Sequence, residues 1–222
     1  MGIITGYICL LCVVLLLLKF IAKRLNITKP NAFLMKIHKH VACGFLLVGM
    51  IHFALVINVL DTRNHIVVIS GILCLAAGFM LTAVCHLMKN RKKEIRFHRL
   101  FSLIIFIMLV LHILFYYVDF NSYKQSVGAI TIEEVDLSDI DDGEYIGSYD
   151  VGYIYVKVRV RVENHTISEV RILEHRNERG KNAESVIKSI IAEQRVDVDA
   201  VSGATNSSLV IKKACENALR GR

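Results

Sequence analysis

Acidic side chains are almost missing from the first 120 residues, which contain only Asp61, Glu94 and Asp119 against 13 lysines and arginines. Residues 121–222 carry 17 Asp and Glu against 14 Lys and Arg. The net charge of +7 therefore arises entirely in the first part of the chain, where the long apolar runs also lie. Basic residues beside apolar runs are typical of membrane flanks, so we expect a lipid bilayer and no nucleic acid as partner.

Three further absences exclude classes of protein. The chain has neither a G-x-G-x-x-G motif nor a P-loop, so nothing in it predicts a nicotinamide site. The apolar start lacks a basic n-region and a small-residue cleavage site, and is not interpreted as a signal peptide. Cys215 is the only cysteine beyond the apolar part, which excludes a disulfide framework there.

Four apolar runs are present, each close to the ~20 residues that cross a bilayer as a helix. Basic residues gather in the first and third connections between them. By the positive-inside rule these connections are cytoplasmic, which places both termini outside. We therefore predict a multi-pass protein of a cell membrane, bacterial in type, with extracytoplasmic N and C termini. The runs cover residues 3–21, 41–60, 66–88 and 100–118 of a membrane domain expected at 1–118.

Cys9 and Cys12 have the C-x-x-C spacing of redox pairs. They lie in a run of leucine and valine without a βαβ context, so plain packing is the favoured interpretation and a redox role the alternative.

Two histidine pairs stand out in the second and fourth runs. His38 is followed by His52, and His98 by His112, each after 14 residues and each starting with a His-Lys or His-Arg dipeptide. Fourteen residues return to within about 40° on a helix and rise about 21 Å, so each pair shares one helix face. Because the two runs cross in the same direction, His38 is expected at the depth of His98 and His52 at that of His112.

Facing imidazoles at two depths predict two b-type haems, with these four histidines as axial iron ligands. Zinc binding or simple packing are the alternatives. The pattern resembles the haem-b membrane cores of ferric reductases, NADPH oxidases and the cytochromes b of quinol-oxidising complexes.

The remaining sequence predicts a linker at 119–141 and a small α+β domain at 142–222. Apolar residues alternate along 153–163, which indicates a half-buried strand, and a turn leads to a second strand at 167–173. Helical spacing of apolar residues predicts helices over 183–194 and 207–219.

Between these helices lies the segment Asp199-Ala-Val-Ser-Gly-Ala-Thr205. Small residues permit close backbone approach, and a helix start favours a phosphate. By itself the segment is also typical of a Ser or Thr N-cap after a glycine turn.

The segment resembles the flavinylation motif of the FMN-binding domain family, which includes covalently flavinylated subunits of sodium-pumping NADH:quinone reductase and of the Rnf complex. The resemblance implies that a flavin transferase joins FMN to the hydroxyl of Thr205 by a phosphoester. It implies contacts from the rest of the motif and from the Asp-Gly-x-Tyr-x-Gly entry at residues 142–147. These cofactor-binding residues are Asp199, Ser202, Gly203, Ala204, Tyr145 and Gly147.

The predicted fold class is therefore multi-domain, with an all-α four-helix transmembrane bundle followed by a small α+β FMN-binding domain. We expect electrons from a cytoplasmic reductase or quinol donor to pass through two haems to FMN and on to an extracytoplasmic acceptor. This makes the protein an electron-transfer component or oxidoreductase. One alternative keeps FMN in a haem-free membrane-anchored subunit of an ion-translocating redox complex. Another treats the outer domain as a sensory module without turnover.

Overall fold

The computed structural model describes residues 2–177 and 180–221, apart from the side chains of Thr28 and Asp61. Its contacts divide the chain into two compact units. One contains residues up to 60 together with 65–117, and the other contains 61–64 together with 118–222.

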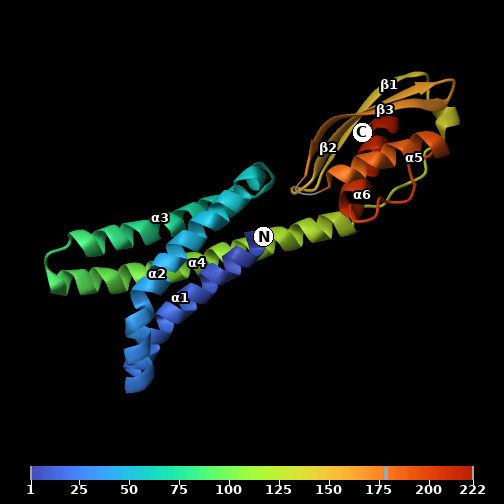
Figure 1. Cartoon of the computed structure of the whole chain (residues 1–222). Helices are drawn as coiled ribbons and strands as arrows, with labels where there is room; N and C mark the ends of the chain where they lie inside the picture. Colours follow the sequence, from blue (N-terminus) through green and yellow to red (C-terminus); the bar gives the residue numbers. More distant parts are fainter. Residues whose placement is uncertain (1, 178–179, 222) are drawn as a thin grey trace. The chain divides into compact units, whose positions relative to one another are not determined.

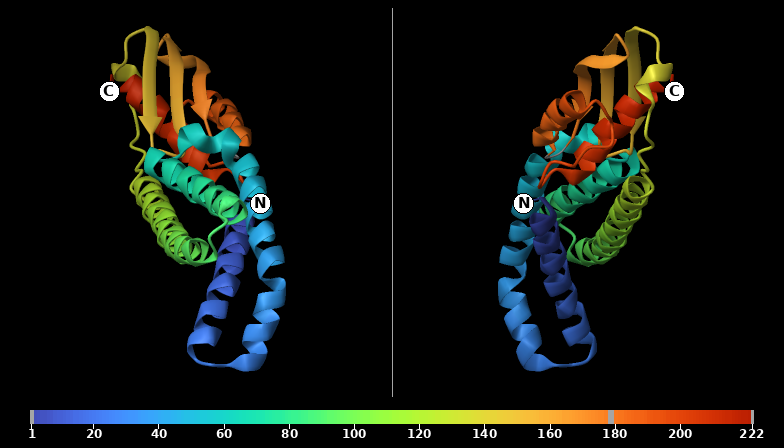
Figure 2. Two further views of the ribbon diagram at one scale, coloured as in Figure 1. Left: turned by 90° about the vertical axis from the view of Figure 1, so that its left-hand side faces the viewer. Right: turned by 90° about the vertical axis from the view of Figure 1, so that its right-hand side faces the viewer.

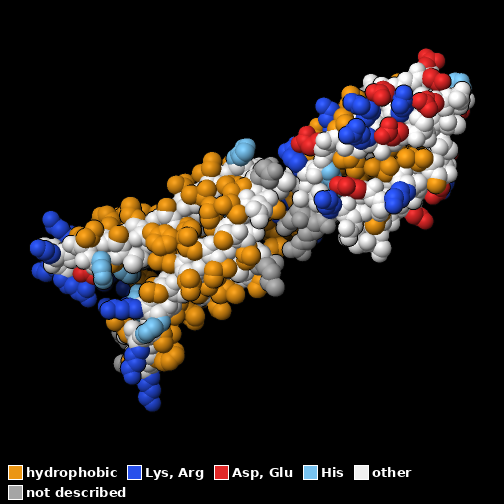
Figure 3. Space-filling view, turned by 45° about the horizontal axis from the view of Figure 1, so that its top comes forward, with side chains coloured by type: hydrophobic (Ala, Val, Ile, Leu, Met, Phe, Trp, Pro, Cys, Tyr) orange, Lys and Arg blue, Asp and Glu red, His pale blue; other side chains and the backbone are white. Residues whose placement is uncertain are grey.

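The first unit is built from four long helices (Figure 1). Each has the length and apolar composition of a membrane-crossing helix, which confirms the four predicted spans. Apolar side chains cover much of the visible surface of these helices (Figure 3). The helices are α1 (Gly2–Arg24), α2 (Thr28–Val56, extended by the 3-10 turn Ile57–Thr62), α3 (His65–Leu87) and α4 (Arg91–Gly128).

All four helices contribute to one apolar cluster inside this unit. Cys9 and Cys74 are buried in it, and every described cysteine is a free thiol. Both positions agree with packing as the role of these cysteines. The buried residues of this cluster are Cys9, Val13, Phe45, Cys74, Ile105 and Leu109.

The second unit contains an antiparallel sheet in the order β1-β2-β3. The strands are β1 (Gly143–Asp150), β2 (Tyr155–Glu163) and β3 (Thr166–Arg176). The valines of β2 alternate with charged residues and are completely buried at positions 156, 158, 160 and 162. They face helices α5 (Val186–Glu193) and α6 (Thr205–Leu219), which lie on one face of the sheet (Figure 2).

The expected elements are present with shifted ends. Asn164 and His165 form the β2–β3 turn with φ of 51° and 55°, the positive values typical of a two-residue hairpin. The predicted helix 183–194 divides into a 3-10 turn (Lys181–Ser185) and α5. Gln194 ends α5 at φ 55°, and its side chain bonds both backbone groups of Ile167.

The segment predicted as a linker, 119–141, instead belongs to the second unit. Helix α4 continues to Gly128, and Val127 and Ile140 are buried in the domain core. Its acidic composition concealed a row of apolar residues that pack against that core. These are Ile130, Ile132, Val135 and Leu137.

Candidate functional site

The loop before α6 ends with Thr205 as the first helical residue. Gly203 has φ of +76°, a conformation that strains other residues, and open space surrounds the position of its missing Cβ. Ser202, Gly203 and Thr205 are exposed, whereas Ala204 is buried. The structure therefore presents the Thr205 side chain at the surface, two residues after a glycine with open space beside it.

The N-terminus of α6 is not closed by a side chain. Ala204 occupies the N-cap position and makes no side-chain cap bond. The alternative interpretation of Thr205 as a simple N-cap is therefore wrong, because Thr205 stands one residue further along. The first-turn amides and the helix dipole of this 15-residue helix favour an anion beside Thr205.

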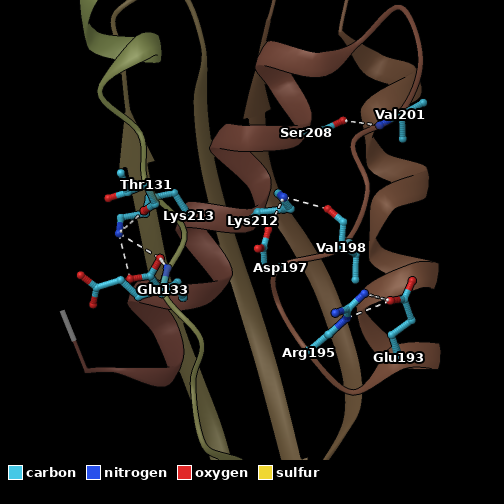
Figure 4. A network of polar contacts seen from close by, with 11 residues as sticks. Thr131, Glu133, Glu193, Arg195, Asp197, Val198, Val201, Ser208, Lys212 and Lys213 are labelled. Carbon is cyan, nitrogen blue, oxygen red and sulfur yellow. Dashed lines mark hydrogen bonds and ion pairs between the residues drawn. The ribbon is translucent and has the colours of Figure 1, made fainter.

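Ser208 holds the loop in place from inside the domain. Its fully buried hydroxyl accepts a hydrogen bond from the Val201 amide at 3.1 Å and donates one to the Ala204 carbonyl at 3.0 Å. One side chain thus closes the loop on the helix that follows it (Figure 4). The backbone on either side of Gly203 is fixed while Thr205 stays accessible.

Lys212 anchors the approach to the loop. Its ammonium group donates to the Asp197 carboxylate at 2.9 Å and to the Val198 carbonyl at 2.7 Å (Figure 4). The lysine side chain is buried, so the segment 197–198 is drawn onto α6 by a charge-assisted contact. Asp199 follows directly in the chain, and its contact with a cofactor remains a prediction.

A segment remote in sequence meets the first turn of α6. A Cβ on Gly180 would overlap the Ser207 hydroxyl and come within 2.6 Å of the Ser207 Cβ. The Gly180 amide donates to Asn177 Oδ1 at 2.7 Å, which joins Gly180 to the residue after β3. No pattern in the sequence predicts that Gly180 lies beside the motif, although only glycine permits this close approach.

His175 is the penultimate residue of β3. Its side chain is 3% exposed, and its Nδ1 is 3.0 Å from Glu184 Oε1. Its Nε2 is buried without a hydrogen-bond partner among the described residues. Residues 178 and 179 lie outside the described part of the chain.

Tyr145 and Gly147 are placed elsewhere on the domain. The Tyr145 hydroxyl donates to the Asp141 carbonyl at 2.7 Å. Gly147 packs against Ala214 and Ala218, which are about 13–20 Å along α6 from Thr205. The structure gives Gly147 a packing role, and contact of both residues with a cofactor stays a prediction.

An aromatic group lies beside the start of α6. Tyr123, near the end of α4, accepts a hydrogen bond from Asn206 Nδ2 at 2.9 Å. Its ring stacks on Tyr153 with 4.6 Å between centroids and an interplanar angle of 18°. No periodicity or motif in the sequence relates these positions, which meet only in the folded domain.

In the first unit, one of the two predicted histidine pairs meets across helices. The ring centroids of His38 on α2 and His98 on α4 are 5.8 Å apart. The His38 Nδ1 atom is buried without a described partner.

The other two histidines are held by matching contacts. His52 Nδ1 lies 2.9 Å from the Gly2 carbonyl and 3.2 Å from the Thr5 hydroxyl. His112 Nδ1 lies 3.1 Å from the Val67 carbonyl and 3.1 Å from Ser70. A bond from Nδ1 to a carbonyl selects the tautomer whose Nε2 is free to bind a metal.

A glycine makes room for the His112 ring, whereas a Cβ at the matching position beside His52 would make only an ordinary contact. A Cβ on Gly6 would be 3.4 Å from the His52 ring, and one on Gly71 would be 2.9 Å from the His112 ring. Carbonyl, hydroxyl and glycine recur at the same i, i+3, i+4 spacing on α1 and α3. Within the described residues, no three His, Cys, Asp or Glu side chains form a metal site. A pair of axial ligands is a different arrangement.

Comparison with known proteins addresses the second unit. The family model described as FMN-binding domain matches residues 152–220. The match includes the loop, Thr205 and all of α6, but neither Tyr145 nor Gly147. No curated protein and no solved structure matches the chain. The chain thus combines four membrane-type helices with a domain that matches the FMN-binding domain family at residues 152–220.

Proposed function

We propose that the protein is a membrane-anchored electron carrier whose FMN is joined through a phosphoester to Thr205. The observation that carries the proposal is the exposed Thr205 on the uncapped first turn of α6, inside the part of the chain that matches the FMN-binding domain. The four apolar helices supply the anchor.

Attachment uses the Thr205 hydroxyl as nucleophile and FAD as donor, on a separate flavin transferase. A bond forms between Thr205 Oγ and the phosphorus of the FMN half, and the pyrophosphate P–O bond to AMP breaks. AMP leaves with the bonding electron pair, and the hydroxyl proton passes to a base of the transferase. The surface position of Thr205 gives such an enzyme access.

The residues around Thr205 support this attachment in three ways. The first-turn amides of α6 point toward the phosphate position. Ser208 fixes the loop, and Gly203 leaves the space beside it open. A bound flavin supplies exchange of one or two electrons, whereas the chain supplies position and insulation.

Protein expressed with its transferase should retain flavin fluorescence on a denaturing gel. Thr205→Ala should abolish that band, because no hydroxyl remains to form the ester. Thr166→Ala is the matched control, since Thr166 is also exposed in this domain and its hydroxyl donates to the Glu163 carbonyl in the β2–β3 turn. Undiminished fluorescence in Thr205→Ala overturns the proposal.

A haem-containing version of this function is the second candidate. It is favoured by the 5.8 Å His38–His98 pair and by the matching carbonyl contacts of His52 and His112. These four side chains would hold two haem irons, and the haems would supply one-electron exchange when bound. The donor is then a cytoplasmic reductase or a quinol, and the acceptor is extracytoplasmic. The family match covers the FMN-binding domain alone, so haem rests on the histidine geometry.

Optical spectra separate the two candidates. Purified protein with haem should show b-type bands that sharpen on reduction, and combined His52→Ala and His112→Ala should remove about half of them. His65→Ala with His86→Ala is the control, because these histidines lie outside the matched pairs. A preparation without haem bands after expression with ample haem leaves the flavin anchor as the function.

A further inference from the structure

A small cavity opens beside Tyr123, which contacts the first turn of α6. Its volume is about 280 Å³. It lies between the last turns of α4 and the turn from β1 to β2. The lining residues are Asp119, Ser122, Tyr123, Ser126 and the segment 150–153.

Tyr123 joins this cavity to the start of α6. Its hydroxyl accepts the hydrogen bond from Asn206, the residue after Thr205. Tyr123 is half-buried, whereas its stacking partner Tyr153 is 6% exposed. The Tyr153 hydroxyl donates to Asp119 Oδ2 at 2.9 Å, and this bond holds the ring on which Tyr123 stacks. Tyr123 is therefore an aromatic surface held in one orientation and still accessible.

The size and chemistry of the cavity fit a flat heteroaromatic ring better than a whole nucleotide. Drug-sized ligand pockets usually start at about 300 Å³, so this cavity admits a ring while a chain and phosphate stay outside. Aromatic rings prefer offset stacking on one another. Ser122, Ser126 and the Gly152 backbone offer polar groups around the rim.

We propose that Tyr123 forms one wall of the seat for the isoalloxazine ring of the flavin attached at Thr205. The inference rests on the proposed function, and it adds a contact from a helix outside the FMN-binding match at 152–220. Asp119 and Asp150 place negative charge at the same seat. They disfavour a reduced flavin anion and lower the reduction potential of the site.

Flavin emission measures the contact directly. A tyrosine touching the ring quenches emission by giving an electron to the excited flavin and taking it back within the same pair. Phenylalanine keeps the ring shape but is too hard to oxidise, whereas tryptophan quenches as tyrosine does. The measured quantity is native emission divided by emission of the same sample after denaturation, which cancels differences in flavin loading.

Full-length protein in detergent, flavinylated by its transferase, should show a low ratio. Tyr123→Phe should raise the ratio several-fold, and Tyr123→Trp should restore it. Tyr145→Phe tests the predicted cofactor contact at the other end of β1, and Tyr7→Phe, an exposed position on α1, is the control. Asp119→Asn, which retains an acceptor for Tyr153, should raise the flavin reduction potential.

Failure of this inference is distinct from failure of the proposed function. Covalent flavin with an unchanged ratio in Tyr123→Phe overturns the seat at Tyr123 and leaves Thr205 attachment intact. A rise in Tyr145→Phe instead moves the ring to the other end of β1. Absence of covalent flavin from the unmodified protein overturns both proposals.

Discussion

Replacing Gly147 by alanine should weaken the packing of α6 against β1 and so favour opening of the second unit. Gly147 itself is remote from the loop that carries Thr205. The new Cβ would lie 2.7 Å from the Ala218 Cα and closer still to the Ala218 nitrogen and the Ala214 carbonyl. Carbon atoms pack at about 3.5–4.0 Å, so α6 must move by about 1 Å. The obstructing atoms are helix backbone and cannot rotate away.

Overpacking of this kind costs about 1–3 kcal/mol, and backbone obstruction places Gly147→Ala in the upper part of that range. The population of opened molecules should then rise about 5–150-fold. Gly128→Ala is the matched control, because no heavy atom lies within 4 Å of its added Cβ.

Cys215 provides the assay. It is 0% exposed, and burial raises the pKa of its thiol to about 12, so it reacts with a maleimide only when the unit opens. Labelling in membranes should accelerate by the same 5–150-fold factor in Gly147→Ala. The other five cysteines are replaced by alanine in every sample. These are Cys9, Cys12, Cys43, Cys74 and Cys85.

Equal labelling rates in Gly147→Ala and the parent protein would refute the close approach of α6 to β1. Fast labelling in both glycine variants would also contradict overlap with α6 as the cause of opening, because Gly128→Ala adds no overlap. Only acceleration confined to Gly147→Ala agrees with the packing.

The remaining predictions concern the same domain. Cys215 has a folded pKa raised above its unfolded value, so its contribution to stability is complete below pH about 9 and is lost toward pH 12; Cys215→Ala should flatten the fall of the melting temperature over that window. Lys212→Met should cost less stability than Lys212→Ala, since it retains the buried stem while losing the bonds to residues 197 and 198, as denaturant titration will show. Ser208→Ala should lose about 1–3 kcal/mol, because the Val201 amide loses its partner, and should slow flavin attachment at saturating transferase. Equal attachment rates would contradict the role of Ser208 in shaping the loop.

The helices, the β2 strand and the motif could be predicted from the sequence alone, because each depends on a local pattern. Apolar runs of membrane length predict helices without knowledge of their neighbours, and the alternating valines of β2 identify a strand with one buried face. The motif ending at Thr205 predicted an attachment residue because the motif is continuous in the chain. The 14-residue histidine intervals likewise predict that each pair shares one helix face, because the period of a helix is known without its neighbours.

Tertiary structure decided what joins residues distant in the chain. Gly180 meets Ser207, Tyr123 meets Asn206, and the Gly2 carbonyl meets His52 only after folding. Glycine leaves no side chain whose periodicity can be read, and a backbone carbonyl carries no residue identity at all. The acidic stretch 129–141 was predicted as linker because its composition is polar, yet its few apolar residues pack on the domain core. Contacts of this kind arise from the shape of the assembled surface, which local pattern does not encode.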